Sequence, residues 1–171
     1  MCSSDLDDPL GGQLVRAVHP GPDGIWIGGE RQSERRTPGR LGLVGADSGQ
    51  VSGIVTAPFG CGISAIEGWP DGRLVVAGTD GGLSLFDPTD RTWQMLHAGD
   101  GSTTVRPRMR RHAGRLWMIT AAELIMVEEP SGTLRPWCRL DGEWYSGPRV
   151  CFADGYAHTL AGRELVSIRL D

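Results

Sequence analysis

Arginine is the residue whose spacing in this sequence best suits the binding of a ligand. Arg16 in VRAV, Arg106 in VRPR and Arg149 in PRVC each precede a glycine turn and an apolar run, and the equivalent stretch between the first two has Ser64 instead. The guanidinium group donates paired hydrogen bonds that match carboxylate and phosphate. These arginines therefore predict a site for an anionic ligand. The alternative is that each faces water or pairs with a nearby acid.

A second group of arginines lies in the polar segment Glu30–Arg40, which reads ERQSERRTPGR. A loop of this length inside a compact domain is usually functional or disordered. Arg31, Arg35 and Arg36 make it a candidate for binding an anion or a protein partner. The alternative is a solvated insertion whose arginines pair with its own glutamates.

Histidine and cysteine give no catalytic or metal-binding pattern. Of the four histidines, only His158 falls within an expected second strand, where burial as a core residue is more common than a role as a base. The cysteines lack the CxxC spacing of a zinc site. We therefore predict no catalytic residue, no metal and no cofactor. Cys138 and Cys151 are expected to be small core residues on strands, and they could form a disulfide if the domain is exported.

Short strands joined by tight turns are the elements that must position these side chains. The stretch Ile63–Leu96 contains four of them, at ISAIEG, LVVA, LSLF and TWQML. The turn between the first two reads Pro70-Asp71-Gly72, in which proline presets φ and glycine accepts a positive φ. Four short strands with tight turns predict an antiparallel meander.

The same unit recurs with a period of about 40 residues. Its turn glycines are Gly24, Gly72, Gly114 and Gly155, and an apolar strand follows each. We expect Trp26 and Trp117 to hold equivalent positions on these second strands.

Four short strands per period are typical of a β-propeller blade. A two-sheet sandwich also uses many short strands, but the repeated register favours the propeller. We predict an all-β propeller of about four four-stranded antiparallel blades, the last one incomplete. Their expected ranges are 13–57, 61–98, 103–140 and 148–171.

Two segments carry a resemblance to known repeats. GPDGIWIGG, from Gly21, and PDGRLVVAGTDGGLSLFD, from Pro70, resemble the blades of two-component-regulator propellers. GRLGLVGADSGQV, from Gly39, looks like a blade of the streptogramin-lyase type. The resemblance implies a propeller and says little about activity, because the motif specifies turns and buried strands.

Composition limits the function classes. The chain has 171 residues and a net charge of −4, which argues against general affinity for nucleic acid. It contains no apolar run long enough to span a membrane. Residues 1–12 are expected to be a non-native or disordered lead, because MCSSDL resembles a translated sequencing adapter rather than a signal peptide. We expect the chain to be part of a larger propeller. The sequence leaves a cytoplasmic and an exported location both open.

These observations predict a non-catalytic recognition or sensor module that binds a small anionic ligand or a protein partner. In a propeller the first strands line the central channel, so Arg16, Arg106 and Arg149 would form a positive collar there. The alternative is an enzyme of the lyase or lactonase type, with a metal or a histidine at the channel mouth. A purely structural platform for protein partners is a third possibility.

Overall fold

The computed structural model describes residues 10–31, 36–99, 106–120, 122–140, 150–161 and 164–170. Within these ranges the regular structure is made of β-strands, and none of the described residues forms a helix of the length and hydrophobicity needed to cross a membrane. The strands are β1 (Leu14–Gly21), β2 (Gly24–Glu30), β3 (Arg40–Gly45), β4 (Val51–Thr56), β5 (Ile63–Gly68), β6 (Leu74–Gly78), β7 (Leu83–Asp87), β8 (Thr92–His97), β9 (Arg108–His112), β10 (Arg115–Ile119), β11 (Glu123–Glu128), β12 (Thr133–Arg139), β13 (Cys151–Ala153), β14 (Tyr156–Ala161) and β15 (Glu164–Arg169).

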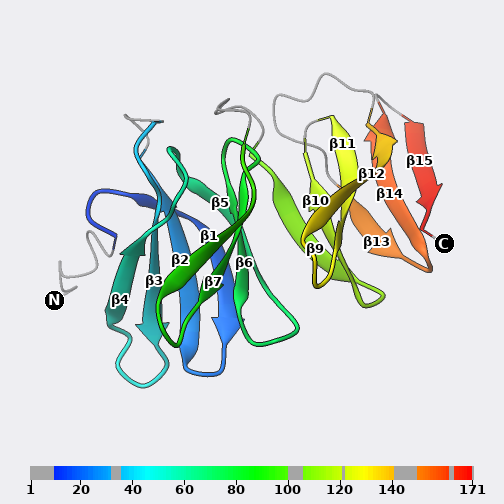
Figure 1. Cartoon of the computed structure of the whole chain (residues 1–171). Helices are drawn as coiled ribbons and strands as arrows, with labels where there is room; N and C mark the ends of the chain where they lie inside the picture. The colour runs from blue at the N-terminus through cyan, green and yellow to red at the C-terminus, as the bar shows by residue number, and fades with distance from the viewer. Residues whose placement is uncertain are drawn as a thin grey trace, which may run out of the picture.

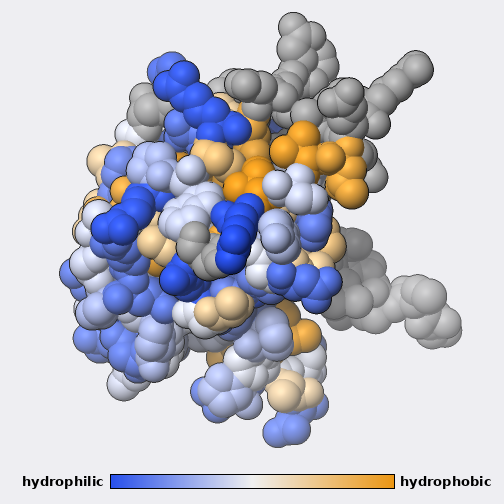
Figure 2. All heavy atoms as spheres, turned by 90° about the vertical axis from the view of Figure 1, so that its right-hand side faces the viewer, coloured by the Kyte–Doolittle hydropathy of each residue, from blue (hydrophilic) through white to orange (hydrophobic). Residues whose placement is uncertain are grey.

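The described strands form four antiparallel sheets, in which each strand pairs with its neighbour in sequence. The first sheet is β1–β4, the second β5–β8, the third β9–β12, and the fourth has three strands, β13–β15. The sheets follow one another from the blue to the red end of the chain (Figure 1). The predicted meanders are therefore confirmed, including the shorter last one. Figure 2 looks onto the fourth sheet from outside and shows a group of hydrophobic side chains in the upper part of this view, with hydrophilic ones over much of the rest.

Tight turns join the first two strands of each sheet. In the third sheet Ala113 and Gly114 have φ values of 48° and 74°, and in the fourth Asp154 and Gly155 have 49° and 78°. Two consecutive residues with positive φ make the mirror-image turn whose twist matches that of the flanking strands. In the first and second sheets only the glycine of the pair, Gly24 or Gly72, has a positive φ, so a glycine in this conformation is what the four turns share.

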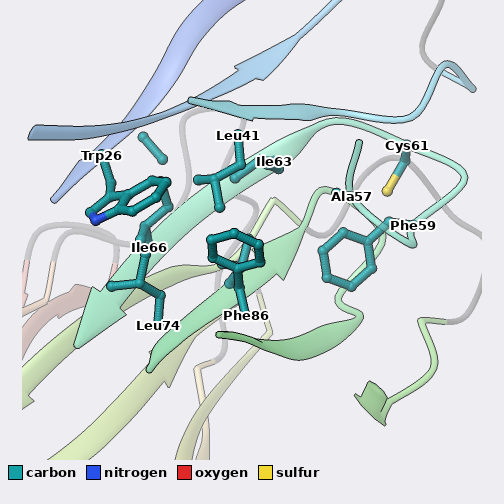
Figure 3. Packing of buried hydrophobic residues seen from close by; sticks show 11 residues of the cluster. Trp26, Leu41, Ala57, Phe59, Cys61, Ile63, Ile66, Leu74 and Phe86 are labelled. Carbon is teal, nitrogen blue, oxygen red and sulfur yellow. The ribbon is translucent and has the colours of Figure 1, made fainter. Parts of the chain in front are cut away.

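The core lies between consecutive sheets as three apolar clusters. Figure 3 shows the cluster between the first and second sheets, where Trp26 and Leu41 of the first sheet meet Ile66 and Phe86 of the second. Each sheet except the first and last therefore buries both of its faces.

Trp26 and Trp117 hold the predicted equivalent positions. Trp26 lies on β2 and Trp117 on β10, each two residues after the pair that closes its hairpin, Gly21 with Gly24 and His112 with Arg115. Both indole rings are buried, with residue exposures of 8% and 1%. The repeat thus sets the strand and the face on which each tryptophan lies.

Candidate functional site

Two of the predicted collar arginines meet on one buried carboxylate. The Nε atom of Arg16 lies 3.3 Å from Oε2 of Glu30, and Nη2 of Arg106 donates to Oε1 of Glu30 over 2.9 Å. Arg16 and Glu30 belong to the first sheet, whereas Arg106 precedes β9 of the third. The cluster therefore spans two sheets that are not neighbours, at the ends of the strands next to the links between sheets.

The two arginines reach this carboxylate from different backbone positions. The pairing of β1 with β2 skips Arg16, which is the extra residue of a β-bulge between Val15 and Ala17. A bulge bends its strand and redirects a side chain. Arg106 lies before its strand with a φ of 39°, and its N–H donates to the carbonyl of Thr79 over 2.9 Å. The sequence predicted that Arg16 and Arg106 share one strand register. They do not, so a shared register is not the cause of their convergence on Glu30.

Glu30 is held in a close-fitting environment. Its side chain is 3% exposed, and a Cβ atom placed on Gly62 would lie 2.6 Å from its Cβ. A side chain at position 62 would therefore push the glutamate aside. A buried carboxylate is costly unless it is paired, so the two guanidinium groups stabilise its position.

The cluster carries two positive charges and one negative charge. The side chains of Arg16 and Arg106 remain 41% and 49% exposed, whereas Glu30 is enclosed. Each guanidinium group has five N–H donors in a planar fork. The buried glutamate thus orients two partly exposed forks, and the net positive charge suits a carboxylate or a phosphate.

Ser64, the serine expected at the collar position of the second sheet, is also a bulge residue. The pairing of β5 with β6 skips it, and its hydroxyl donates to the carbonyls of Ala77 and Gly78. Ser64 is therefore bound to its own sheet. Arg149 and Arg35 lie outside the described residues, so their predicted roles stay predictions.

The arginines of the segment after β2 hold the start of the described chain. Arg31 donates to the carbonyl of Gly11 over 3.4 Å, and Arg40 donates to that of Leu10 over 3.3 Å. Leu10 itself is fully buried. Arg36 is exposed. The described parts of the segment Glu30–Arg40 therefore contact residues 10 and 11, which belong to the expected lead. A role of Arg31 or Arg36 in ligand binding stays a prediction.

The structure corrects two expectations for histidine and cysteine. His158 is only partly buried, and its Nδ1 lies 2.9 Å from the hydroxyl of Ser167. Cys151 is exposed rather than part of a core. Cys61, Cys138 and Cys151 are all free thiols. Among the described residues, no three of His, Cys, Asp and Glu are grouped so as to hold a metal ion.

A cavity of about 450 Å³ lies between the third and fourth sheets, beside their first hairpin turns. Its walls combine aromatic rings with charged groups, and they include His112, Arg115, Trp117, Asp154, Tyr156 and Arg169. Its size falls in the usual range for small-molecule sites. It is separate from the arginine–glutamate cluster, because it lies at the hairpin ends of the strands.

No protein-family model matches this sequence, and neither does any curated protein. Solved structures share its fold. A catalytically inactive virginiamycin B lyase from Staphylococcus aureus, solved with quinupristin, matches with a TM-score of 0.63 and 9% identity over 92% of this chain. An auxiliary nutrient binding protein from Bacteroides thetaiotaomicron matches with a TM-score of 0.58 and 13% identity over 86% of it. The extracellular domain of a hybrid two-component system from the same species matches with 0.55 and 13% over 92%.

The chain has the β-propeller fold. The predicted fold class and the resemblance to lyase-type and two-component-type propellers are therefore confirmed at the level of structure, and each sheet is a blade. The chain spans 56%, 36% and 22% of the length of the three proteins above. At these identities the likeness shows the fold alone. Arg16 lies on β1, the first strand of its blade, and Arg106 lies just before β9, the first strand of the third blade.

Proposed function

We propose that this propeller is a recognition module that binds a small anionic ligand, of the carboxylate or phosphate class, at Arg16 and Arg106. The observation that carries the proposal is the convergence of these two arginines, from the first and third blades, on the enclosed carboxylate of Glu30. Glu30 acts as a positioning residue, because it orients both guanidinium groups toward one place while leaving them partly exposed.

Two further features support a site at these two arginines. Arg106 keeps a left-handed backbone conformation, which is strained for a residue other than glycine, and such strain is concentrated at functional sites. The bulge at Arg16 is a device that re-aims a side chain next to a site. The left-handed conformation costs stability and the bulge interrupts the regular strand pairing. The two features occur at the two residues that reach the carboxylate of Glu30.

The observations favour recognition over the lyase or lactonase alternative. That alternative calls for a histidine or a set of metal ligands at the channel mouth. The described histidines lie elsewhere: His19 is beside Glu67, His112 against Phe152 and His158 beside Ser167, and His97 ends β8, where it pairs with Leu83.

Titration calorimetry with citrate and with inorganic phosphate tests the proposal. We expect the wild-type protein to bind at least one of them, and Arg16→Gln and Arg106→Gln each to weaken binding about tenfold or more, as the loss of a charged hydrogen bond predicts. Arg139→Gln is the matched control, because this arginine is 86% exposed on the outer strand β12 and also faces a glutamate.

Two outcomes would overturn the proposal. One is that neither anion binds the wild-type protein at millimolar concentration. The other is that Arg169→Gln, in the cavity between the third and fourth blades, abolishes binding while Arg16→Gln leaves it unchanged. Circular dichroism of each variant separates loss of binding from loss of fold.

A further inference from the structure

The first hairpins of the second and third blades differ in what they place against the following blade. The link between Gly68 and Leu74 in the second blade carries Trp69, which is 4% exposed and packs in the apolar cluster between the second and third blades. The corresponding hairpin of the third blade is a tight turn that contains Ala113 and has no large side chain. Ala113 lines the cavity of about 450 Å³ between the third and fourth blades. The cavity therefore lies where a small residue takes the place of a tryptophan.

Aromatic side chains form part of the wall of this cavity. His112 lines it and stacks on Phe152 of the fourth blade, with ring centroids 5.2 Å apart and the ring planes 18° from parallel. Trp117 lines it as well and is only 1% exposed. Such rings offer a flat apolar surface to an aromatic or a large aliphatic group.

Charged groups of both signs line the same cavity. Arg115, on the third blade, is anchored across the interface, because its Nη1 donates to the carbonyl of Leu170 over 2.8 Å. Its other N–H donors make no hydrogen bond in the described part of the chain. Asp154, in the first hairpin of the fourth blade, is exposed, and no described residue pairs with its carboxylate. Arg169 adds a second guanidinium group to the wall.

We propose that this cavity binds a free α-amino acid with an aromatic or large apolar side chain. Arg115 takes the carboxylate, because a guanidinium fork donates paired hydrogen bonds to that group. Asp154 takes the ammonium group, and the rings of His112 and Trp117 take the side chain. A few polar groups in a largely apolar cavity are the usual arrangement of a small-molecule site.

The two opposite charges separate this site from the arginine–glutamate cluster. There, the acid is enclosed and already paired with both guanidinium groups, so that cluster suits an anion. Here, Arg115 and Asp154 belong to different blades, and both keep unpaired polar atoms toward a ligand with one charge of each sign. The inference does not depend on the proposed anion site.

Titration calorimetry with L-phenylalanine and two of its analogues tests the proposal. 3-Phenylpropionate lacks the ammonium group, and phenethylamine lacks the carboxylate. We expect phenylalanine to bind and each analogue to bind at least about tenfold more weakly, because each loses one charged hydrogen-bonded contact. The proposal is wrong if phenylalanine does not bind at about 10 mM, or if either analogue binds as tightly as the amino acid.

Two variants assign the two charges. Asp154→Asn should weaken the binding of phenylalanine and phenethylamine at least about tenfold and should not weaken that of 3-phenylpropionate. Asparagine suits this position, because Asp154 has a φ of 49° and asparagine accepts such values. Arg115→Gln should weaken phenylalanine and 3-phenylpropionate and leave phenethylamine unchanged. Arg135→Gln is the matched control, since this arginine is 63% exposed on the outer strand β12 of the same blade and pairs with Glu128.

The crossed pattern of losses distinguishes a binding role from a structural one. A variant that only damages the fold weakens all three ligands alike, and such a result for Asp154→Asn would overturn the assignment. Arg16→Gln should leave phenylalanine binding unchanged, whereas a loss there would place the ligand at the arginine–glutamate cluster instead. Binding of citrate or phosphate should likewise be unaffected by Asp154→Asn, so each of the two proposed sites can fail without the other.

Discussion

The interface between the first two blades and the interface between the last two use the same register but are filled differently. In the first, the ring of Trp26 meets Phe86 of the next blade edge-on, with ring centroids 5.5 Å apart. In the last, Trp117 makes the corresponding edge contact with Trp137 of its own blade, also at 5.5 Å, and reaches Phe152 of the next at 6.0 Å. The repeat thus determines the strand position of the tryptophan, whereas the local sequence determines which aromatic ring it packs against.

Polar contacts at the hairpin ends show the same difference. His19 lies 3.8 Å from Glu67 across the first interface, and Arg111 donates to the carbonyl of Gly68 over 2.7 Å across the second. Across the third, His112 stacks on Phe152 with centroids 5.2 Å apart, and the cavity lies beside it. A cavity thus lies at this last interface, and we expect the interface to tolerate substitution best.

Truncation at the first interface should have the largest effect. We expect Phe86→Ala to lower the free energy of unfolding by about 3–5 kcal/mol, because it leaves a large cavity among fully buried side chains. Urea unfolding followed by tryptophan fluorescence measures this change. Leu165→Ala should stay within about 0.5 kcal/mol of wild type, since that side chain is exposed. Equal costs at the two positions would contradict the difference between interior and end faces.

The two equivalent tryptophans should respond differently to phenylalanine. The indole Nε1 of Trp117 is buried without a hydrogen-bond partner among the described residues. An unpaired buried donor costs about 1–3 kcal/mol, so Trp117→Phe removes a penalty along with some packing. We expect its net cost to stay below about 1 kcal/mol and to be smaller than that of Trp26→Phe. A larger cost at Trp117 would mean that its N–H is satisfied in solution.

The strands and their order could be predicted because the signals for them are local. The turns at Gly72 and Gly114 depend on backbone geometry within a few residues, and the apolar runs beside them give the strand length. The exposure of His158 and Cys151 could not be predicted in this way. His158 lies at the second-strand position that Trp26 and Trp117 bury in their own blades, and its exposure depends on which sheets surround the fourth one.

The candidate site was predictable only in part. The sequence indicated Arg16 and Arg106 as members of a collar, but it gave Glu30 only as one charge of a polar loop. Glu30 is the last residue of β2, and its burial depends on Gly62 in the link before the next blade. Such a contact between distant segments has no local pattern. The remaining signal was an acid directly after the two glycines of IWIGGE, at the end of a strand expected to be buried.

The thiols of Cys61 and Cys138 compare the first and last interfaces through the smallest of the expected effects. Cys61 packs in the first apolar cluster and Cys138 beside the last, and burial raises the pKa of each thiol above its ordinary value. A thiol whose pKa is raised by folding stabilises the protein below its ordinary pKa. This contribution is lost as the pH rises toward the raised value, because the unfolded chain gives up its proton first.

We therefore expect the free energy of unfolding to fall at alkaline pH, by at most about 1.4 kcal/mol per pH unit for each thiol. Cys61→Ala should flatten this dependence more than Cys138→Ala, since Cys61 is 2% exposed and Cys138 only half-buried. Labelling with a disulfide reagent gives an independent measure, in which, of the three cysteines that the structure describes, the exposed Cys151 should react first and Cys61 last. If Cys138 reacted more slowly than Cys61, the last interface would be the more tightly closed of the two, which would contradict the presence of a cavity there.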